Sequence, residues 1–147
     1  MRVVIQRVKE AQVTVAGQLK GQIAMGLLIF LGVASEDTPS SAEYLVKKIT
    51  ELRLFEDAQG KMNLAASEVG AQYLVVSQFT LYGNCDKGRR PSFDQAADLV
   101  KGEELYNYFV TQLKVTKAKV ETGKFRAMMD VSLINDGPVT LIVDSKR

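Results

Sequence analysis

Hydroxyl and amide side chains stand together where an apolar run of the sequence ends. Ser77, Gln78, Phe79 and Thr80 follow the apolar residues 73–76. Because strand ends present functional groups on a rigid scaffold, this segment is a candidate for chemistry. Ser77 or Thr80 as a nucleophile would need a base nearby, and the sequence contains no histidine. A second interpretation stays open, in which the two hydroxyls only satisfy backbone groups of the following loop.

The segment 135–140 reads Asn-Asp-Gly-Pro-Val-Thr and holds the second candidate feature. Gly137 followed by Pro138 between two predicted strands indicates a turn. A sharper interpretation is a cis peptide bond between these two residues, which would present backbone carbonyl oxygens in a fixed direction. The pattern alone leaves both interpretations open.

Basic residues concentrate in two stretches. Lys87, Arg89 and Arg90 lie on a predicted loop over residues 83–93, which holds two glycines and a proline. The second stretch, near the carboxyl end, contains Lys114, Lys117, Lys119, Lys124 and Arg126. Both stretches are typical of a solvated surface, and both also fit contacts with the phosphates of an RNA. The net charge of +2 does not decide between them, since ordinary surfaces reach such values by chance.

Composition excludes several kinds of site. Without histidine the chain cannot assemble a Ser-His-Asp, Cys-His or usual zinc hydrolase site, and we expect neither metal nor cofactor. Cys85 is the single cysteine and the amino terminus lacks a continuous apolar region, so neither a disulfide framework nor a secretory signal is indicated. The longest apolar run, residues 25–34, is far shorter than the roughly 20 residues of a membrane-spanning helix. We therefore predict a cytoplasmic protein with no membrane partner.

Residues 1–147 are expected to form a single domain, because the length leaves little room for a second core. Alternating apolar residues predict short antiparallel strands around a turn at residues 16–17. Residues 26–33 are apolar on both faces of any strand they form, which is typical of a central strand covered on both sides. Thr38 and Pro39 are followed by residues at helical spacing, which predicts a helix over residues 39–52.

The second half of the chain follows the same rules. The further predicted elements are a buried strand over residues 73–79, a helix over 94–113, and three closing strands over 115–121, 125–134 and 139–143. Strands outnumber helices and most connections are hairpin-like. The prediction is an α+β fold: a mixed, mainly antiparallel sheet curled into a sandwich or barrel, with two helices on one side.

Seven segments, taken in order, carry a family resemblance. They are residues 1–8 (MRVVIQRV), Leu52-Arg53 with Phe55, residues 60–63 (GKMN), 77–81 (SQFTL), 87–93 (KGRRPSF), Leu105-Tyr106 and 135–140 (NDGPVT). They run over essentially the whole chain, and the two most diagnostic motifs, SQFTL and NDGPVT, are intact. On these residues the chain resembles the D-aminoacyl-tRNA deacylases, the D-Tyr-tRNA(Tyr) deacylase family.

The resemblance implies a homodimeric hydrolase that acts on aminoacyl-tRNA. Members of the family cleave the ester between a D-amino acid and the 3′-terminal adenosine of tRNA. They also remove glycine mischarged on tRNA(Ala), and they reject L-aminoacyl-tRNA, a chiral proofreading step in translation quality control. The active sites lie at the subunit interface, where a cis Gly-Pro peptide enters the partner's site and its carbonyls contact the amino group of the substrate.

Carried over to this chain, the resemblance assigns two sets of residues. The catalytic segment that lines the adenosine and ester pocket is Ser77, Gln78, Phe79 and Thr80. Substrate binding and chiral selectivity fall to Gly137, Pro138, Arg7, Phe125 and Met129. From the basic stretches themselves, Lys87, Arg89, Arg90 and Arg126 are expected to contact tRNA. One departure from the family pattern is Arg126, which stands where a small residue is common.

The expected mechanism requires no histidine. An aminoacyl ester is already labile, so backbone amides near Phe79 and Thr80 and the ribose 2′-hydroxyl, which positions or activates water, are expected to suffice. Thr80 as a covalent nucleophile is the alternative mechanism. Two other functions remain open: a non-catalytic RNA-binding module needs only the basic segments, and a general small-ester hydrolase needs only the pocket.

Overall fold

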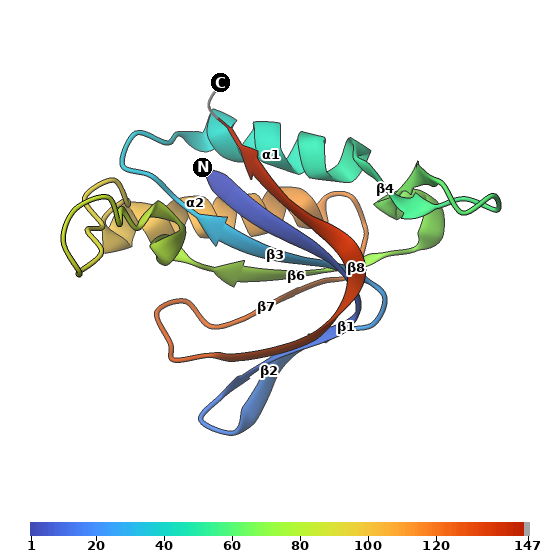
Figure 1. The fold of residues 1–147 in the computed structure, drawn as a ribbon, viewed down its shortest axis with the longest axis horizontal. Helices are drawn as coiled ribbons and strands as arrows, with labels where there is room; N and C mark the ends of the chain where they lie inside the picture. The colour runs from blue at the N-terminus through green and yellow to red at the C-terminus, as the bar shows by residue number, and fades with distance from the viewer. Residues whose placement is uncertain (146–147) are drawn as a thin grey trace.

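The computed structural model describes residues 1–145, which form a curled sheet covered by two helices (Figure 1). The strands are β1 (Arg2–Val15), β2 (Gln18–Ile23), β3 (Gly26–Gly32), β4 (Arg53–Glu56), β5 (Met62–Ala65), β6 (Gln72–Ser77), β7 (Val120–Thr122) and β8 (Asp130–Asp144). The helices are α1 (Pro39–Glu51) and α2 (Leu99–Lys114), with 3-10 helices η1 (Ala66–Val69) and η2 (Phe79–Tyr82). None of the helices in residues 1–145 is long and apolar enough to cross a membrane.

The main sheet is mixed and nearly closes on itself. Its strand order is β2-β1-β3-β6-β7. The long strand β1 pairs with β3 through its first half and with β2 through its second half, and β8 pairs with the opposite edge of β1 along both halves. The β3–β6 and β6–β7 pairs are parallel, whereas β1 pairs antiparallel with β2, β3 and β8. In Figure 1, β8 sweeps alongside β1 over almost its whole length. This arrangement confirms the predicted α+β fold with a curled sheet.

The strand β3 separates two apolar clusters. Leu27 and Ile29 pack with α1 and α2 on one face, and Leu28 packs with Leu74 and Val76 inside the curl on the other. All of these side chains are buried. Burial on both faces is the reason that β3 has a continuous apolar sequence, and it confirms the prediction of a central strand.

The helix α1 begins at Pro39, as predicted. Thr38 lies in extended conformation before the helix, and its N–H donates to Oγ of Ser41 over 3.2 Å. Proline at the first helical position loses no hydrogen bond, because that N–H has no partner in a helix. The helix buries Leu45 and Ile49 against the sheet, on the same side as α2.

The helix α2 begins at Leu99, five residues later than residue 94, where the sequence predicted its start. Residues 95–97 instead bond to the chain after β3: Ser35 N–H donates to Gln95 O, and Ala97 N–H donates to Val33 O. Asp98 then caps the helix by accepting a hydrogen bond from Lys101 N–H at 2.9 Å. The earlier start was wrong because contacts with a distant segment, including a bridge between Ala34 and Ala96, hold residues 95–97 outside the helix.

The closing strands also differ from the prediction. Residues 115–117 continue the end of α2 as turns, so β7 is only Val120–Thr122, and residues 124–127 form another turn. The two strands predicted at 125–134 and 139–143 are one strand, β8, which runs through the Asn-Asp-Gly-Pro segment. A small antiparallel hairpin of β4 and β5 forms over residues 53–65.

Candidate active site

The strand β6 delivers the candidate catalytic segment to the surface. It runs parallel to β3, and Gln78 N–H donates to Leu31 O at 2.8 Å just beyond the last residue of the strand. The chain then turns into η2, which leaves Phe79 with 56% of its surface exposed. Gln78 Nε2 donates to Thr80 Oγ1 over 2.5 Å. An exposed aromatic ring beside amide and hydroxyl groups is a suitable surface for a nucleoside.

A cleft of about 810 Å³ opens at this strand end. Three segments form its walls: the end of β6 with Phe79, residues 93–99 before and at the start of α2, and the turn at residues 125–129. A volume of this size lies within the range of small-molecule sites. The cleft is mostly apolar, and the charged side chains that line it among the described residues are Asp94, Asp98 and Arg126.

Aromatic contacts hold two of these walls. The rings of Phe79 and Phe93 meet edge to face, with centroids 5.0 Å apart. Phe125 packs on Tyr106 of α2, with centroids 5.8 Å apart. Tyr106 in turn donates its hydroxyl to Val75 O of β6 over 2.9 Å. Burial raises the pKa of Tyr106 above its ordinary value, so the hydroxyl stays protonated and keeps this bond.

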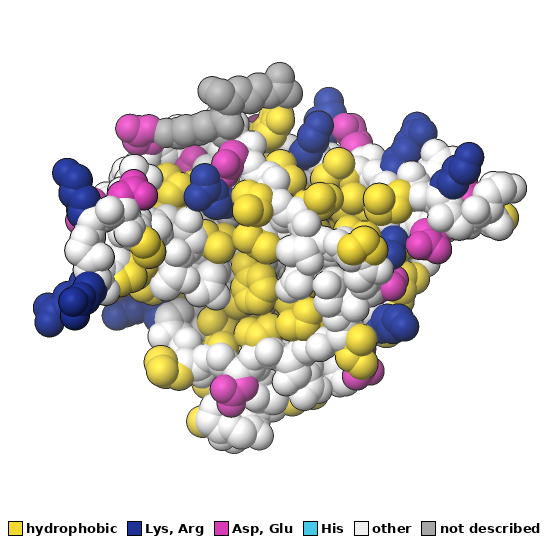
Figure 2. Space-filling model, in the orientation of Figure 1, with side chains coloured by type: hydrophobic (Ala, Val, Ile, Leu, Met, Phe, Trp, Pro, Cys, Tyr) yellow, Lys and Arg dark blue, Asp and Glu magenta, His cyan; other side chains and the backbone are white. Residues whose placement is uncertain are grey.

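The cleft gathers some of the residues assigned from the sequence and leaves others outside. Those that line it are Ser77, Gln78, Phe79, Phe125, Arg126 and Met129. Thr80 lies directly beyond the lining, in η2. Lys87, Arg89 and Arg90 are exposed on the loop after η2, where Figure 2 shows basic side chains at the left margin of the molecule. Arg7, Gly137 and Pro138 lie on the β1–β8 pair, away from the cleft lining of their own chain.

The wall at residues 93–99 was not predicted from the sequence. Phe93, Asp94 and Asp98 reach the cleft because residues 95–97 bond to the segment after β3, a contact between positions about 60 apart in the chain. One local signal was present. Asp98 is a typical cap residue directly before the helical pattern of α2, and it indicated that residues 94–97 precede the helix.

The Gly137–Pro138 segment is an excursion from β8 held by β1. Gln6 pairs with Thr140 and Val8 pairs with Asn135, so residues 136–139 stand opposite Arg7 alone. The peptide bond between Gly137 and Pro138 is cis, as the resemblance implied. A register irregularity of this kind bends the strand locally while β8 continues on both sides of it.

Arg7 is buried beneath this excursion, with 4% of its surface exposed. Its Nη1 donates to Leu54 O at 2.6 Å. Its Nε lies 3.0 Å from Oδ2 of Asp136, an ion pair outside hydrogen-bond geometry, and Glu56 lies within 3.8 Å of Nη2. The guanidinium therefore joins the β4 strand to the residue before Gly137.

Asn135 is a second anchor, which the sequence assignment had not singled out. Its Nδ2 donates to Arg7 O at 2.9 Å and to Val139 O at 3.2 Å. One side chain thus bonds to β1 and to the far end of the excursion. Its position within the Asn-Asp-Gly-Pro motif was the available signal, since asparagine side chains commonly close turns.

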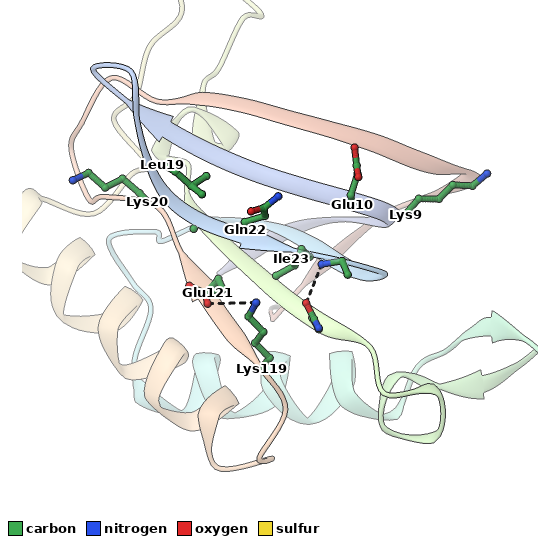
Figure 3. A pocket seen from close by; sticks show the side chains of 11 residues that line it. Lys9, Glu10, Leu19, Lys20, Gln22, Ile23, Lys119 and Glu121 are labelled. Atoms are coloured by element: carbon green, nitrogen blue, oxygen red, sulfur yellow. Dashed lines mark hydrogen bonds and ion pairs between the residues drawn. The ribbon is translucent and has the colours of Figure 1, made fainter.

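A smaller cleft of about 510 Å³ lies at the seam between β2 and β7 (Figure 3). Some of its polar groups bond to each other: Lys119 pairs with Glu121 at 3.8 Å, and Gln72 Oε1 accepts from Ala24 N–H at 2.9 Å. Figure 3 shows Lys9 and Lys20 pointing outward at opposite ends of it. None of the residues assigned from the sequence lines this cleft, so the cleft at the end of β6 is the better candidate site. Residues 1–145 contain no group of three or more Cys, Asp and Glu side chains placed to hold a metal ion.

The sequence matches the family model of the D-Tyr-tRNA(Tyr) deacylases over residues 4–144. The D-aminoacyl-tRNA deacylase of Desulfatibacillum aliphaticivorans is 62% identical over 146 residues, which cover 99% of this chain and 100% of that protein. The D-aminoacyl-tRNA deacylase of Halothermothrix orenii is 56% identical over 147 residues, covering 100% of this chain and 99% of the relative.

Two solved structures have the same fold. A protein described as c-Myc DNA Unwinding Element Binding Protein superimposes with a TM-score of 0.93 at 40% identity, over 100% of both chains. A probable eukaryotic D-amino acid tRNA deacylase gives a TM-score of 0.86 at 18% identity, over 97% of this chain and 98% of that one, which is a likeness of fold alone. With the family model and relatives above half identity agreeing over the full length, the chain belongs to the D-Tyr-tRNA(Tyr) deacylase family.

Proposed function

We propose that this chain hydrolyses the ester that joins a D-amino acid to the 3′-terminal adenosine of tRNA, releasing free tRNA and the D-amino acid. It also removes glycine mischarged on tRNA(Ala), rejects L-aminoacyl-tRNA, and works in the cytoplasm where charged tRNA is used. The observation that carries the proposal is the cleft of about 810 Å³ at the end of β6, lined by Ser77, Gln78 and Phe79, in a chain of the deacylase family.

The proposed mechanism places the ester at the end of β6. Phe79 and Thr80 are the first residues of η2, so their N–H groups have no acceptor within that helix. Such amides stabilise the negative charge that develops on the ester carbonyl oxygen during attack by water. The ribose 2′-hydroxyl of the substrate positions this water, and because the ester is labile, the barrier to be lowered is modest.

Thr80 is proposed to position groups and not to attack the ester. Its hydroxyl oxygen accepts a hydrogen bond from the Gln78 amide over 2.5 Å, which occupies one of its lone pairs. The sequence has no histidine to remove the hydroxyl proton. We therefore expect no acyl-enzyme on Thr80 during turnover.

Chiral selectivity is assigned to the main-chain carbonyls of Gly137 and Pro138. Neither side chain offers a hydrogen-bonding group, so the carbonyl oxygens are what this segment presents to an α-ammonium group. Arg7 and Asn135 hold the segment against β1. A rigid wall discriminates by repelling a substituent on one side of the α-carbon, and glycine has no such substituent.

The proposal requires a homodimer. Gly137 and Pro138 do not line the cleft of their own chain, so they act on substrate only if they enter the cleft of a partner subunit. The strand β8 exposes Ile134, Leu141 and Ile142 on either side of them. Exposed apolar side chains grouped on one strand are typical of the core of a subunit interface.

Replacing Asn135 with alanine is expected to loosen the Gly137–Pro138 segment. Two carbonyls, those of Arg7 and Val139, lose their donor, which lowers the free energy of unfolding by about 1–2 kcal/mol. The ratio of D- to L-tyrosyl-tRNA hydrolysis falls at the same time, because the Gly137–Pro138 segment that excludes the L-substituent becomes mobile. Chemical denaturation and deacylation assays measure the two effects. Gln6→Ala is the control, since its bond to Thr140 is exposed; equal effects of the two changes would contradict the role given to Asn135.

The function is tested by incubating the protein with D-Tyr-tRNA, L-Tyr-tRNA, Gly-tRNA(Ala) and a simple D-tyrosine ester. We expect rapid release of D-tyrosine and glycine from tRNA, little release of L-tyrosine, and slow hydrolysis of the simple ester, which lacks the nucleoside. Binding of tRNA without hydrolysis would favour a nucleic-acid-binding module, consistent with the basic loop. Equal hydrolysis of all esters would favour a general esterase.

A further inference from the structure

Arg126 occupies a backbone conformation that suits glycine. Ala127 N–H donates to Lys124 O at 3.2 Å, which closes a β-turn, and Arg126 is the third residue of this turn with φ +65°. A positive φ at the third position is the feature of type II turns that favours glycine there. An arginine is less stable in this position than glycine, because its Cβ crowds the backbone.

Two other non-glycine residues have a positive φ, and both lie away from the cleft that Arg126 lines. Ala16 lies in the turn between β1 and β2, and Lys117 follows the end of α2. Neither lines a cleft described above, whereas Arg126 lines the one at the end of β6. Lys117 is therefore a matched cation in the same backbone region away from the site.

Contacts within the chain do not explain why an arginine stands at this position. The side chain is exposed, and none of the ion pairs or side-chain hydrogen bonds found within residues 1–145 involves it. Among the described residues that line the cleft, Arg126 is the only cation. The two carboxylates, Asp94 and Asp98, belong to the wall formed by residues 93–99, and they accept hydrogen bonds from Ser92 Oγ and Lys101 N–H.

We propose that Arg126 binds the 5′-phosphate of the terminal nucleotide of the substrate. This inference rests on the proposed function. The terminal ribose carries the amino acid ester on one side and its 5′-phosphate on the other, so a phosphate must lie at the mouth of the cleft when the ester lies at Ser77–Phe79. A guanidinium binds a phosphate through paired charge-assisted hydrogen bonds. Asp94 and Asp98 repel the same phosphate, which directs the RNA end toward the turn that holds Arg126.

The test compares two small substrates that differ in one group: the D-tyrosyl ester of adenosine and the D-tyrosyl ester of adenosine 5′-monophosphate. In the wild-type protein the phosphate lowers KM. In Arg126→Gly the KM of the phosphorylated ester rises by about tenfold, the scale of one charge-assisted contact, so the two KM values converge while kcat changes little. Arg126→Lys retains part of the difference. Lys117→Gly removes a cation in the same conformation and leaves both KM values unchanged.

Thermal denaturation accompanies the kinetics. Both glycine variants unfold at the wild-type temperature or above it, so a higher KM in Arg126→Gly is not a folding defect. If Arg126→Gly alters neither KM, or alters both equally, the phosphate contact is wrong. If wild-type protein hydrolyses no D-aminoacyl ester, the proposed function fails separately. Calorimetry with the non-hydrolysable 3′-amide analogues then decides the inference, because loss of the phosphate-dependent affinity in Arg126→Gly supports it and an unchanged affinity overturns it.

Discussion

Replacing Gly137 with alanine is expected to slow deacylation of D-aminoacyl-tRNA strongly while the subunit folds normally. A Cβ atom at this position would meet only Asn135 Oδ1, at 3.9 Å, so the chain itself has room for it. In the proposed dimer the added methyl group lies beside the carbonyls that receive the substrate. A clash worth about 3 kcal/mol in the transition state lowers the rate about a hundredfold. Single-turnover hydrolysis of D-Tyr-tRNA measures the loss, and thermal unfolding measures the expected absence of a folding effect.

Mixing two inactive variants tests whether the sites are shared. Gly137→Ala has an intact cleft, and Gln78→Ala has an intact Gly137–Pro138 segment. A mixed dimer therefore contains one complete site, and random exchange restores about a quarter of the wild-type sites. Sedimentation should show a species of about twice the 16.2 kDa chain mass. A Gly137→Ala protein with wild-type activity, or a mixture no more active than its components, would refute the shared site.

Replacing Asp37 with alanine is expected to lower the free energy of unfolding by about 3–5 kcal/mol. Asp37 is buried, with 1% of its surface exposed, and it forms an ion pair with the buried terminal ammonium of Met1. Its second oxygen accepts from Ala34 N–H at 2.6 Å, and Ser145 Oγ lies 2.6 Å from the same ammonium. Without the carboxylate a buried positive charge loses its counter-ion, which is much costlier than loss of an exposed pair. Urea denaturation measures the change.

Asp144→Ala provides the matched control. Its carboxylate pairs with Arg2 at 2.8 Å, but both side chains keep nearly two fifths of their surface exposed. Exposed ion pairs contribute about 0–1 kcal/mol, so this variant should remain close to wild type. If the two aspartate variants lost similar stability, burial would not be the source of the Asp37 effect.

Short stretches of the sequence were enough to predict several elements. The helix α1 begins at Pro39 because Thr38 and proline at the first position suit a helix start in any context. The strands β3 and β6 were recognisable because burial on both faces requires apolar residues without alternation. The segment Ser77–Phe79 was likewise a candidate site from its position at the end of such a strand, and the structure places it in the wall of a cleft.

The sequence alone determined which residue types were available for chemistry: no histidine, two intact family motifs, and hydroxyl and amide groups after a buried strand. Tertiary structure decided which other residues lie next to these groups. Residues 95–97 bond to the chain after β3 and delay α2, and Arg7 and Asn135 keep β8 continuous through Gly137–Pro138. These contacts join positions about 60 to 130 residues apart. Spacing and capping rules act within a few residues along the chain, so only the folded packing could determine them.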